Sequence, residues 1–262
     1  MKHLSYQIER QVATIVLHNP PQNRIDDQMV DELAAAVEAV GRGDARAVLV
    51  RAEGENFSFG GDIMTWPGAT TRELRARFDR YMSVFNSFER LPLPVVAAVQ
   101  GLCFGGGLEL ALRADVVFAG AKATFGHPEQ SLGIVTVLGG IYRVAERAGR
   151  SRASEWALTS EKVPAATMER FGVVNRVVAD EVLISEATLF AEKLATGPTR
   201  AYAAHKALLR AWAVGGVAAA DEAMFDIAMP LFETEDVKTG LKSAVDALKA
   251  GKPRPVLEFK GH

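Results

Sequence analysis

Two glutamates and two groups of glycines are the residues of this sequence whose types and spacing could do chemistry together. Glu109 follows the glycine run Gly105–Gly107 in "FGGGLEL", Glu129 lies in "FGHPEQS", and the pair Gly60 and Gly61 lies in "FSFGGDI". Glycine lets a backbone N–H face a ligand with no Cβ in the way, and a helix N-terminus adds partial positive charge. Two such N–H groups, from separate loops, predict an oxyanion hole.

The two glutamates suit proton transfer beside such a hole, because a pair of carboxyls can act as acid and base without a metal or a cofactor. Other interpretations exist for each residue alone. Glu109 could complement the helix dipole or pair with Arg113 one turn on, and Glu129 could be a solvated loop residue. Either glycine group could be only a tight turn. If the strands that precede the two motifs are sheet neighbours, both carboxyls emerge at one edge, which favours the catalytic interpretation.

Several familiar nucleotide-binding, catalytic and metal-binding motifs are excluded. Gly105 and Gly107 begin a GxGxxG pattern, but position 110 is leucine, and no GK[ST] phosphate loop exists. The segment "NFSFG" approaches a nucleophile elbow, yet Asn56 replaces the first glycine. The five histidines show no metal-ligand spacing and Cys103 is the single cysteine, so we expect no metal site.

Composition limits the class of protein. With 262 residues, 48% hydrophobic content and a formal net charge of -2, the chain can bury a sizeable core and has no basic excess for nucleic acid. One cysteine fits a reducing compartment. The N-terminus has no apolar signal-peptide core, and no apolar run reaches the roughly 18 residues of a membrane span. We therefore expect a soluble, cytoplasmic protein that binds neither membrane nor nucleic acid.

The elements that must position these residues form two zones. The first 120 residues alternate strands and helices, and the nearly continuous apolar strands predict a parallel sheet covered by helices, with a further helix after the glycine run. Strands are expected at 4–10, 12–18, 45–53, 93–101 and 115–120, and helices at 29–41 and 71–91. From residue 137 helices dominate: 137–149, 151–160, 164–172, 181–196, 199–215, 217–232 and 235–251, with one strand at 173–179. The tail 252–262 is too rich in proline and charge to continue a helix.

Residues 97–133, "AAVQGLCFGGGLELALRADVVFAGAKATFGHPEQSLG", closely resemble the signature region of the crotonase (enoyl-CoA hydratase/isomerase) superfamily. Residues 56–63, "NFSFGGDI", resemble its first oxyanion segment, and the similarity extends over essentially the whole chain. The resemblance implies an α/β fold, a crotonase-like ββα spiral over residues 1–195 that carries an acyl-CoA site. Residues 196–262 would form a C-terminal helical trimerisation region, and the assembly would be a homotrimer or a hexamer built as a dimer of trimers.

The resemblance also implies roles for single residues. The N–H groups of Gly61 and Gly106 would hold the thioester oxygen of an acyl-CoA, and Glu109 and Glu129 match the acid/base pair of hydratases. The residues implied in CoA or substrate binding are Gln22, Phe59, Gly60, Asp62, Ile63, Met64 and Gly105. The substrate would carry the coenzyme A, so no separate cofactor is expected.

The implied reaction is hydration of an enoyl-CoA double bond, with Glu109 activating the water and Glu129 donating the proton, a division that sequence leaves open. Three positions depart from the usual hydratase pattern: the short loop "PPQNRID" lacks a lysine, Phe59 replaces a small residue, and Val137 replaces a frequent glycine. The alternatives are an enoyl-CoA isomerase, an alicyclic dienoyl-CoA hydratase, a ring-opening hydrolase of the same superfamily, and a non-catalytic CoA-binding subunit.

Overall fold

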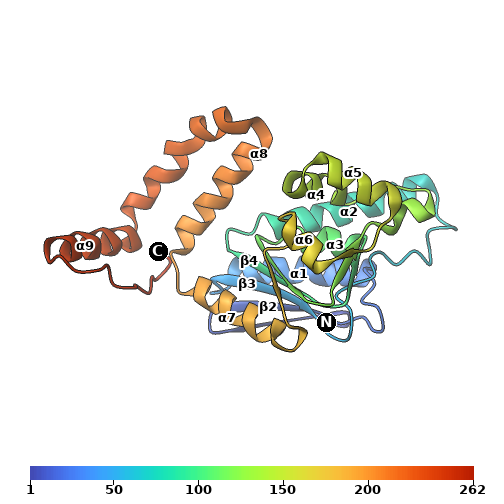
Figure 1. The fold of residues 1–262 in the computed structure, drawn as a ribbon, viewed down its shortest axis with the longest axis horizontal. Coiled ribbons are helices and arrows are strands. Elements are labelled where there is room, and N and C mark those ends of the chain that lie inside the picture. The colour runs from blue at the N-terminus through green and yellow to red at the C-terminus, as the bar shows by residue number, and fades with distance from the viewer.

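A six-stranded sheet forms the centre of the protein in the computed structural model, which describes all residues from Met1 to His262. Its order is β1-β2-β3-β4-β6-β9; β1 and β2 are antiparallel and every other pair is parallel. The strands are β1 Leu4–Glu9, β2 Val12–Leu17, β3 Ala47–Ala52, β4 Val95–Val99, β6 Val116–Gly120 and β9 Arg176–Val178 (Figure 1). The parallel, helix-covered sheet predicted from the sequence is therefore confirmed.

Helices cover both faces of this sheet, which explains why the inner strands β2, β3, β4 and β6 are buried on both sides. Successive strand residues point to opposite faces. Val48 and Val50 join the large core that also contains residues of α1 (Asp27–Arg42) and α2 (Thr71–Glu89). Leu49 joins a smaller cluster on the other face, packed under α7 (Leu183–Ala195).

A second sheet of three short strands lies beside the first and was not predicted. It consists of β5 Leu102–Phe104, β7 Thr124–Gly126 and β8 Val163–Pro164. Strands of two or three residues are too short to show an alternating pattern, so the sequence carries no signal for them. This sheet matters for the site because β5 and β7 run parallel, and each leads directly into one of the two glutamate motifs.

Helix ends follow local capping chemistry. The Asp26 side chain accepts the Met29 N–H at the start of α1, at 2.8 Å. Thr70 and Glu73 form a reciprocal capping box at the start of α2. These caps satisfy backbone donors that a helix start leaves unpaired; α2 begins at the predicted residue, and α1 begins two residues before the predicted start at 29.

Short helices follow the glycine run and fill the middle of the chain. Helix α3 begins at Gly106, inside the run rather than after it, and ends at Ala111, so Glu109 is its fourth residue. The others are η1 Pro128–Leu132, α4 Gly140–Ala148, α5 Arg150–Thr159, α6 Ala165–Arg170 and η2 Asp180–Val182. The helices expected over 137–172 are thereby confirmed as α4, α5 and α6.

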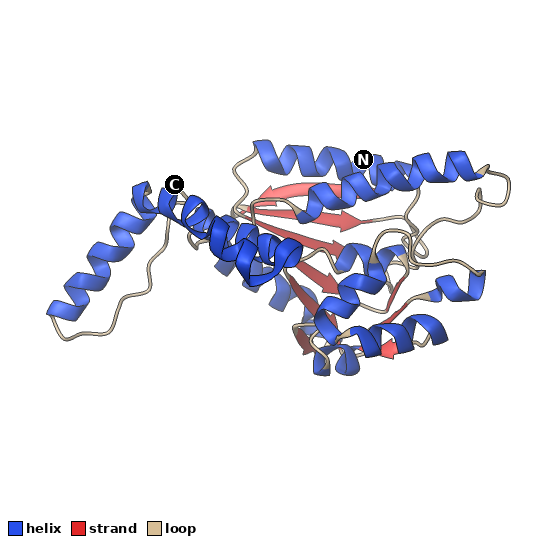
Figure 2. Cartoon of the chain, turned by 90° about the horizontal axis from the view of Figure 1, so that it is seen from above, coloured by secondary structure: helices blue, strands red, loops and turns tan.

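The C-terminal helices form an arm that projects from the body of the molecule (Figure 1 and Figure 2). The arm, residues 199–249, contains α8 Thr199–Ala228, η3 Met229–Glu233 and α9 Glu235–Lys249. Gly215 and Gly216 have non-helical backbone angles inside α8, so the two helical segments expected here are separated by a kink. The tail forms no helix, as predicted, and returns to the body, where the Phe259 N–H donates to the Thr196 carbonyl at 2.9 Å.

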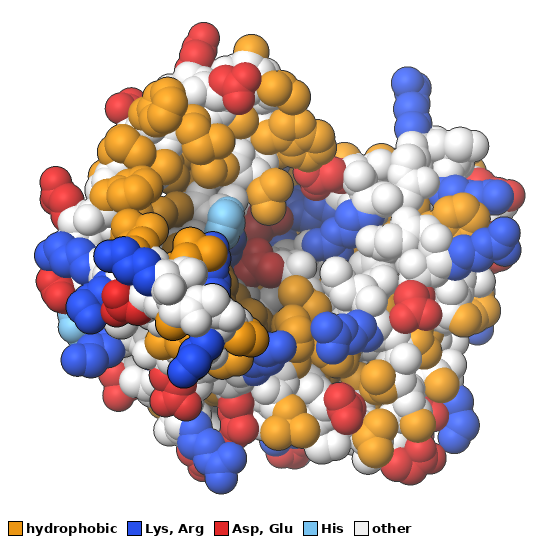
Figure 3. Space-filling model, turned by 60° about the vertical axis from the view of Figure 1, so that its left-hand side comes forward, with side chains coloured by type: hydrophobic (Ala, Val, Ile, Leu, Met, Phe, Trp, Pro, Cys, Tyr) orange, Lys and Arg blue, Asp and Glu red, His pale blue; other side chains and the backbone are white.

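The arm exposes many hydrophobic side chains, which gather over one lobe in the space-filling view (Figure 3). They are Leu209, Trp212, Val214, Val217, Met224, Phe225, Met229, Phe232, Leu241, Val245 and Leu248. No helix combines the length and apolar character needed to span a membrane.

Candidate active site

The two glycine motifs meet because the segment before Gly60 pairs with β5. The Ser58 N–H donates to the Leu102 carbonyl at 3.1 Å, and the Phe104 N–H donates to the Ser58 carbonyl at 2.9 Å. Gly107 permits this close approach, since a Cβ there would stand 2.6 Å from the Ser58 Cβ. Loops that are far apart in the sequence are thus held against each other by backbone hydrogen bonds.

Gly61 and Gly106 consequently lie side by side. A Cβ built on Gly106 would stand 3.5 Å from the Gly61 nitrogen, and one on Gly60 would stand 3.1 Å from the Gly106 nitrogen. Neither nitrogen donates a hydrogen bond among those of the turns and loops. The structure therefore brings together two backbone N–H groups, one of them at the N-terminus of α3, as an oxyanion hole requires.

Glu109 is buried on α3, with 1% of its surface exposed, and one of its oxygens is tethered. Oε1 accepts the N–H groups of Leu138 at 2.7 Å and Gly140 at 3.0 Å, and no hydrogen bond reaches Oε2. Burial raises the pKa of Glu109, and the two N–H donors oppose that rise. The carboxyl is therefore fixed in orientation and keeps one oxygen free for a proton.

The ion pair between Glu109 and Arg113 that the sequence left open does not form. The Arg113 guanidinium instead donates to Asn86 Oδ1 at 2.6 Å, Glu89 Oε2 at 3.0 Å and the Leu138 carbonyl at 2.7 Å. Both backbone groups of Leu138 are thus held: its carbonyl accepts from Arg113 and its N–H donates to Glu109. Arg113 supports Glu109 through this backbone rather than by contact of the two charges.

Glu129 lies on η1 and is 9% exposed, so the solvated-loop interpretation is wrong. Its carboxyl meets α3 because the Gly105 N–H donates to the Gly126 carbonyl at 3.0 Å, joining the two motifs. Gly105 has φ of +48°, and a Cβ there would stand 2.8 Å from Glu129 Oε1. Glycine is therefore required both by the backbone conformation and by the space the carboxyl occupies.

Burial raises the pKa of both carboxyls, and the two differ in their hydrogen-bond partners. Burial, and then the charge of Glu109, raise the pKa of Glu129 to about 7. Glu129 Oε2 is buried without a hydrogen-bond partner, whereas Glu109 Oε1 has two N–H donors that stabilise the ionised form. Because the two groups interact, they titrate as a pair.

Most residues expected to bind CoA or substrate form one strip, residues 59–64 together with Gln22, which is hydrogen-bonded to Phe59. The Phe59 N–H donates to the Gln22 carbonyl at 3.0 Å, and Asp62 Oδ1 accepts the Met64 N–H at 3.1 Å. The Phe59 ring meets the Phe104 ring edge-on, with centroids 6.0 Å apart. The strip ends at Met64, whose side chain is 81% exposed.

Three features of the site were not found from the sequence. The N–H groups of Leu138 and Gly140 orient Glu109, and the glycine pair at 139–140 was their only signal. The Trp66 ring lies beside Gly61, where a Cβ would stand 3.3 Å from Trp66 Cζ2. His127 lies buried next to Glu109 and carried no signal beyond its residue type.

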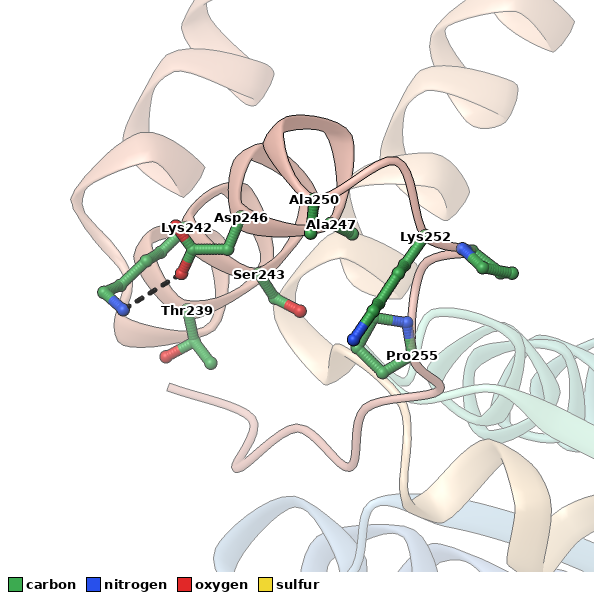
Figure 4. Close-up of a pocket in the computed structure, with 9 residues that line it drawn as sticks. Thr239, Lys242, Ser243, Asp246, Ala247, Ala250, Lys252 and Pro255 are labelled. Atoms are coloured by element: carbon green, nitrogen blue, oxygen red, sulfur yellow. Dashed lines mark hydrogen bonds and ion pairs between the residues drawn. The ribbon is translucent and has the colours of Figure 1, made fainter.

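Two hollows elsewhere in the molecule lack this chemistry. One of about 560 Å³ lies between α9 and the tail, where Lys242 and Asp246 form a solvated ion pair (Figure 4). Another of about 890 Å³ lies between α8 and α4 and is lined by charged side chains such as Arg147 and Lys206. Neither contains Glu109 or Glu129, and no three His, Cys, Asp or Glu side chains cluster as metal ligands.

The fold and the site together define a spiral α/β protein that presents two backbone N–H donors next to two buried carboxyls. Comparison with known proteins agrees with that description. The model of the family described as enoyl-CoA hydratase/isomerase matches residues 7–251. The chain belongs to this family.

Relatives named as hydratases are similar over most of the chain. A mitochondrial enoyl-CoA hydratase of Pongo abelii is 30% identical over 241 residues, covering 91% of this chain and 82% of that protein. A mevalonyl-coenzyme A hydratase of Beauveria bassiana is 36% identical over 222 residues, covering 80% of this chain and 78% of that protein. The crystal structure of an enoyl-CoA hydratase from Bacillus anthracis superposes with a TM-score of 0.89 at 25% identity and covers 100% of both chains. The predicted crotonase-type fold is thereby confirmed.

Proposed function

We propose that this protein adds water across the 2,3 double bond of an enoyl-CoA thioester. The observation that carries the proposal is the convergence of the Gly61 and Gly106 N–H groups with the carboxyls of Glu109 and Glu129. The hydratase names of the relatives in this family support the same reaction class.

The thioester oxygen accepts hydrogen bonds from Gly61 and Gly106, which stabilise the enolate that forms on it. Loss of one such donor costs roughly 3–4 kcal/mol of barrier in other enzymes. Glu109 Oε2 takes one proton from water while the hydroxyl bonds to C3, and the protonated Glu129 gives its proton to C2. Glu109 ends protonated and Glu129 ionised, and proton exchange with solvent restores the pair. The two N–H donors to Glu109 Oε1 favour its ionised form and Glu129 Oε2 is buried without a partner, and both observations support this division of roles.

The strip from Gln22 to Met64 is proposed to hold the coenzyme A portion of the substrate, with Gly60, Ile63 and Gly105 shaping the backbone around it. Phe59 and Trp66 provide aromatic surface near the reacting end. The substrate would bring the only coenzyme the reaction needs. The single, buried Cys103 supports a working place in a reducing compartment such as the cytoplasm.

Isotope tracing in ¹⁸O-labelled water tests the reaction. Purified protein with crotonyl-CoA, and with longer and cyclic enoyl-CoAs, is expected to lose enoyl absorbance and to yield a 3-hydroxyacyl-CoA carrying one ¹⁸O. A shifted double bond without label would indicate an isomerase, and label in a ring-opened acid would indicate a ring-opening hydrolase. A preference for cyclic dienoyl-CoA would indicate the alicyclic dienoyl-CoA hydratase.

Two substitutions separate catalysis from simple CoA binding. Glu109→Gln and Glu129→Gln are each expected to lower hydration by a factor of about 10²–10⁴, the usual contribution of a general acid or base. Both variants should still bind CoA. If no enoyl-CoA is turned over while CoA binds equally to all three proteins, the chain is a non-catalytic CoA-binding subunit.

We further propose that the arm assembles the chain into a homotrimer, or into a hexamer of two trimers. The exposed apolar side chains of α8, η3 and α9 support this, because an apolar surface of that extent is unusual on a monomer. The body over residues 1–195 would then carry the catalytic site, and residues 196–262 would carry most of the subunit contacts.

A further inference from the structure

The hollow between the arm and the body is lined by an excess of basic side chains that the proposed reaction does not use. It has a volume of about 890 Å³ and lies between α8, α4 and the end of α2. Its charged side chains are six cations and three carboxylates, namely Arg90, Arg113, Arg143, Arg147, Lys206, Arg210, Glu89, Asp115 and Glu146. This basic hollow therefore carries a formal excess of three positive charges.

Part of the positive charge is neutralised within the chain. Glu89 pairs with Arg113 at 3.0 Å and also with Arg143. Asp115 pairs with Lys206 at 2.8 Å. These pairs hold α2, α4 and α8 together around the hollow, and they account for two of its three carboxylates.

Two cations of the basic hollow remain both exposed and unpaired. Arg147 is partly buried and donates to two backbone carbonyls, whereas Arg90 and Arg210 are exposed and form no ion pair. Beside Arg210 on α8, Leu209 is 66% exposed and Trp212 is 46% exposed. A small anion would neutralise the cations but leave these apolar side chains in water. A protein surface would cover both, so the hollow is suited to a protein partner.

The arm itself carries a surface of the complementary kind. Residues 212–237 contain no Lys or Arg. Glu222 and Asp226, four residues apart on the second half of α8, are exposed and form no ion pair. Phe225 lies beside them and is 70% exposed. This part of the arm thus joins unpaired carboxylates to apolar surface, just as the hollow joins unpaired cations to apolar surface.

The two surfaces do not meet within one chain, because the ion pairs of the basic hollow are those of Glu89 and Asp115 alone. Every copy of the chain carries both surfaces, so a second copy can supply what the first lacks. A contact between two different surfaces of identical chains leads from each copy to the next, and it closes into a ring when the rotation allows.

We propose that the second half of α8 of one copy, with Glu222 and Asp226, docks against the basic hollow of the next copy, at Arg90 and Arg210. The inference rests on the assembly proposed above and names the two surfaces that meet in it. The carboxylates of the arm neutralise the unpaired cations, and the apolar side chains of the arm cover those beside the hollow. Because each copy gives one arm and one hollow, a closed ring leaves neither surface exposed.

Reversal of the charge on either surface tests the contact. Arg90→Glu with Arg210→Glu reverses the hollow, and Glu222→Lys with Asp226→Lys reverses the arm. Each pair of changes is expected to raise the dissociation constant of the assembly at least 100-fold, because like charges then face each other. Sedimentation and light scattering across a range of concentrations measure it. Arg90→Gln with Arg210→Gln is a milder pair if the reversed hollow does not fold, and should raise the constant about tenfold.

The four reversals in one chain give a sharper test. Arm and hollow are then complementary again with their signs exchanged, so the dissociation constant should return to within about tenfold of the wild type. The exchanged protein should not mix with the wild type, whose acidic arm would face an acidic hollow. Two differently tagged proteins, mixed as dilute monomers and captured through one tag, measure this sorting.

Matched controls make the same changes of charge elsewhere. Arg72→Glu with Lys162→Glu reverses two exposed cations that do not line the hollow. Glu181→Lys with Glu186→Lys reverses two exposed carboxylates outside the arm. Both control proteins should assemble as the wild type does.

The outcomes are distinguishable. If neither reversal changes the mass, this contact is wrong, while assembly through another part of the arm stands. A fourfold variant that folds but does not assemble would contradict the pairing of these two surfaces. Binding of inorganic phosphate to the wild type, lost in the reversed hollow at unchanged mass, would assign the hollow to a small anion instead. A wild type that is always monomeric refutes the contact and the assembly together, whereas absence of hydration leaves both standing.

Discussion

Gly105 and Glu129 occupy interlocking positions: the space where a Cβ of residue 105 would stand is 2.8 Å from Glu129 Oε1. The glycine run and the second carboxyl are thus parts of one arrangement, made by the parallel pairing of β5 with β7. The same run supplies the Gly106 N–H at the next position, so the glycine that leaves room for Glu129 and the proposed oxyanion donor are adjacent residues.

Gly105→Ala tests this relationship directly. The methyl group would displace the Glu129 carboxyl, and alanine at a φ of +48° costs about 1 kcal/mol or more. We expect kcat/KM for hydration to fall at least 100-fold and the free energy of unfolding to fall by about 1–2 kcal/mol. Gly54→Ala is a matched control, because Gly54 has a φ of +83° with nothing within 4 Å of its Cβ position. Equal losses of activity in both variants would refute the steric argument.

The raised pKa of Glu129 predicts a pH dependence of activity. If Glu129 is the proton donor, kcat/KM should fall as the pH rises through about 7, where this carboxyl ionises. A pH–rate profile between pH 5 and 9 measures it. Activity that stays constant or rises up to pH 9 would show that the protonated Glu129 is not required.

The same shift predicts that Glu129 destabilises the fold above neutral pH. Its folded-state pKa, about 7, lies above the ordinary 4.5, so the folded state binds more protons between these values and loses stability as the pH rises through them. Glu129→Gln removes this cost. We expect it to raise the free energy of unfolding by about 2–3 kcal/mol at pH 8, with no gain near pH 4. Thermal unfolding at both pH values checks this, with Glu55→Gln, an exposed carboxyl, as control. A gain of equal size at both pH values would contradict the explanation.

Arg113 is predicted to support both stability and catalysis. Arg113→Met removes the cation that donates to the Leu138 carbonyl and to Asn86, while Glu89 keeps its pair with Arg143, and hydrogen bonds to a charged group are worth about 1.5–3 kcal/mol. Hydration should fall as well, because the Leu138 peptide no longer holds Glu109 firmly. Urea denaturation and steady-state kinetics measure the two effects. Arg75→Met breaks an exposed pair with Asp79 and should cost less than about 0.5 kcal/mol; a similar cost in both variants would count against the network.

Assembly through the arm is tested by a charge on its apolar surface. Phe225→Asp places a carboxylate on an exposed aromatic position of α8 and is expected to shift the protein from trimer or hexamer to monomer. Light scattering coupled to size-exclusion chromatography gives the mass. Leu158→Asp makes the same kind of change at an exposed leucine of α5, outside the arm, and should keep the assembly. A wild type that is monomeric at all concentrations would refute the proposal.

Much of the fold could be predicted because its elements are long and periodic. Strands β2, β3 and β4 and helices α1, α2 and α9 have apolar patterns that a single sequence shows clearly. The second sheet could not be predicted, because its strands have two or three residues and exist only through pairing with distant segments. The start of α3 was placed too late for a related reason: glycine has a low helix propensity, and packing against Ser58 overrides it.

The sequence alone determined the order of the elements, the two glycine motifs, the two glutamates and the family, because all of these depend on residues close together along the chain. Tertiary structure alone decided the surroundings of each carboxyl. Glu109 accepts the N–H groups of Leu138 and Gly140, and Arg113 donates to the Leu138 carbonyl. The His127 ring packs against Gly140. These contacts join segments from different helices and loops, and burial then shifts the pKa values. Local sequence carries no record of such distances, so the surroundings of each carboxyl follow only from the packed chain.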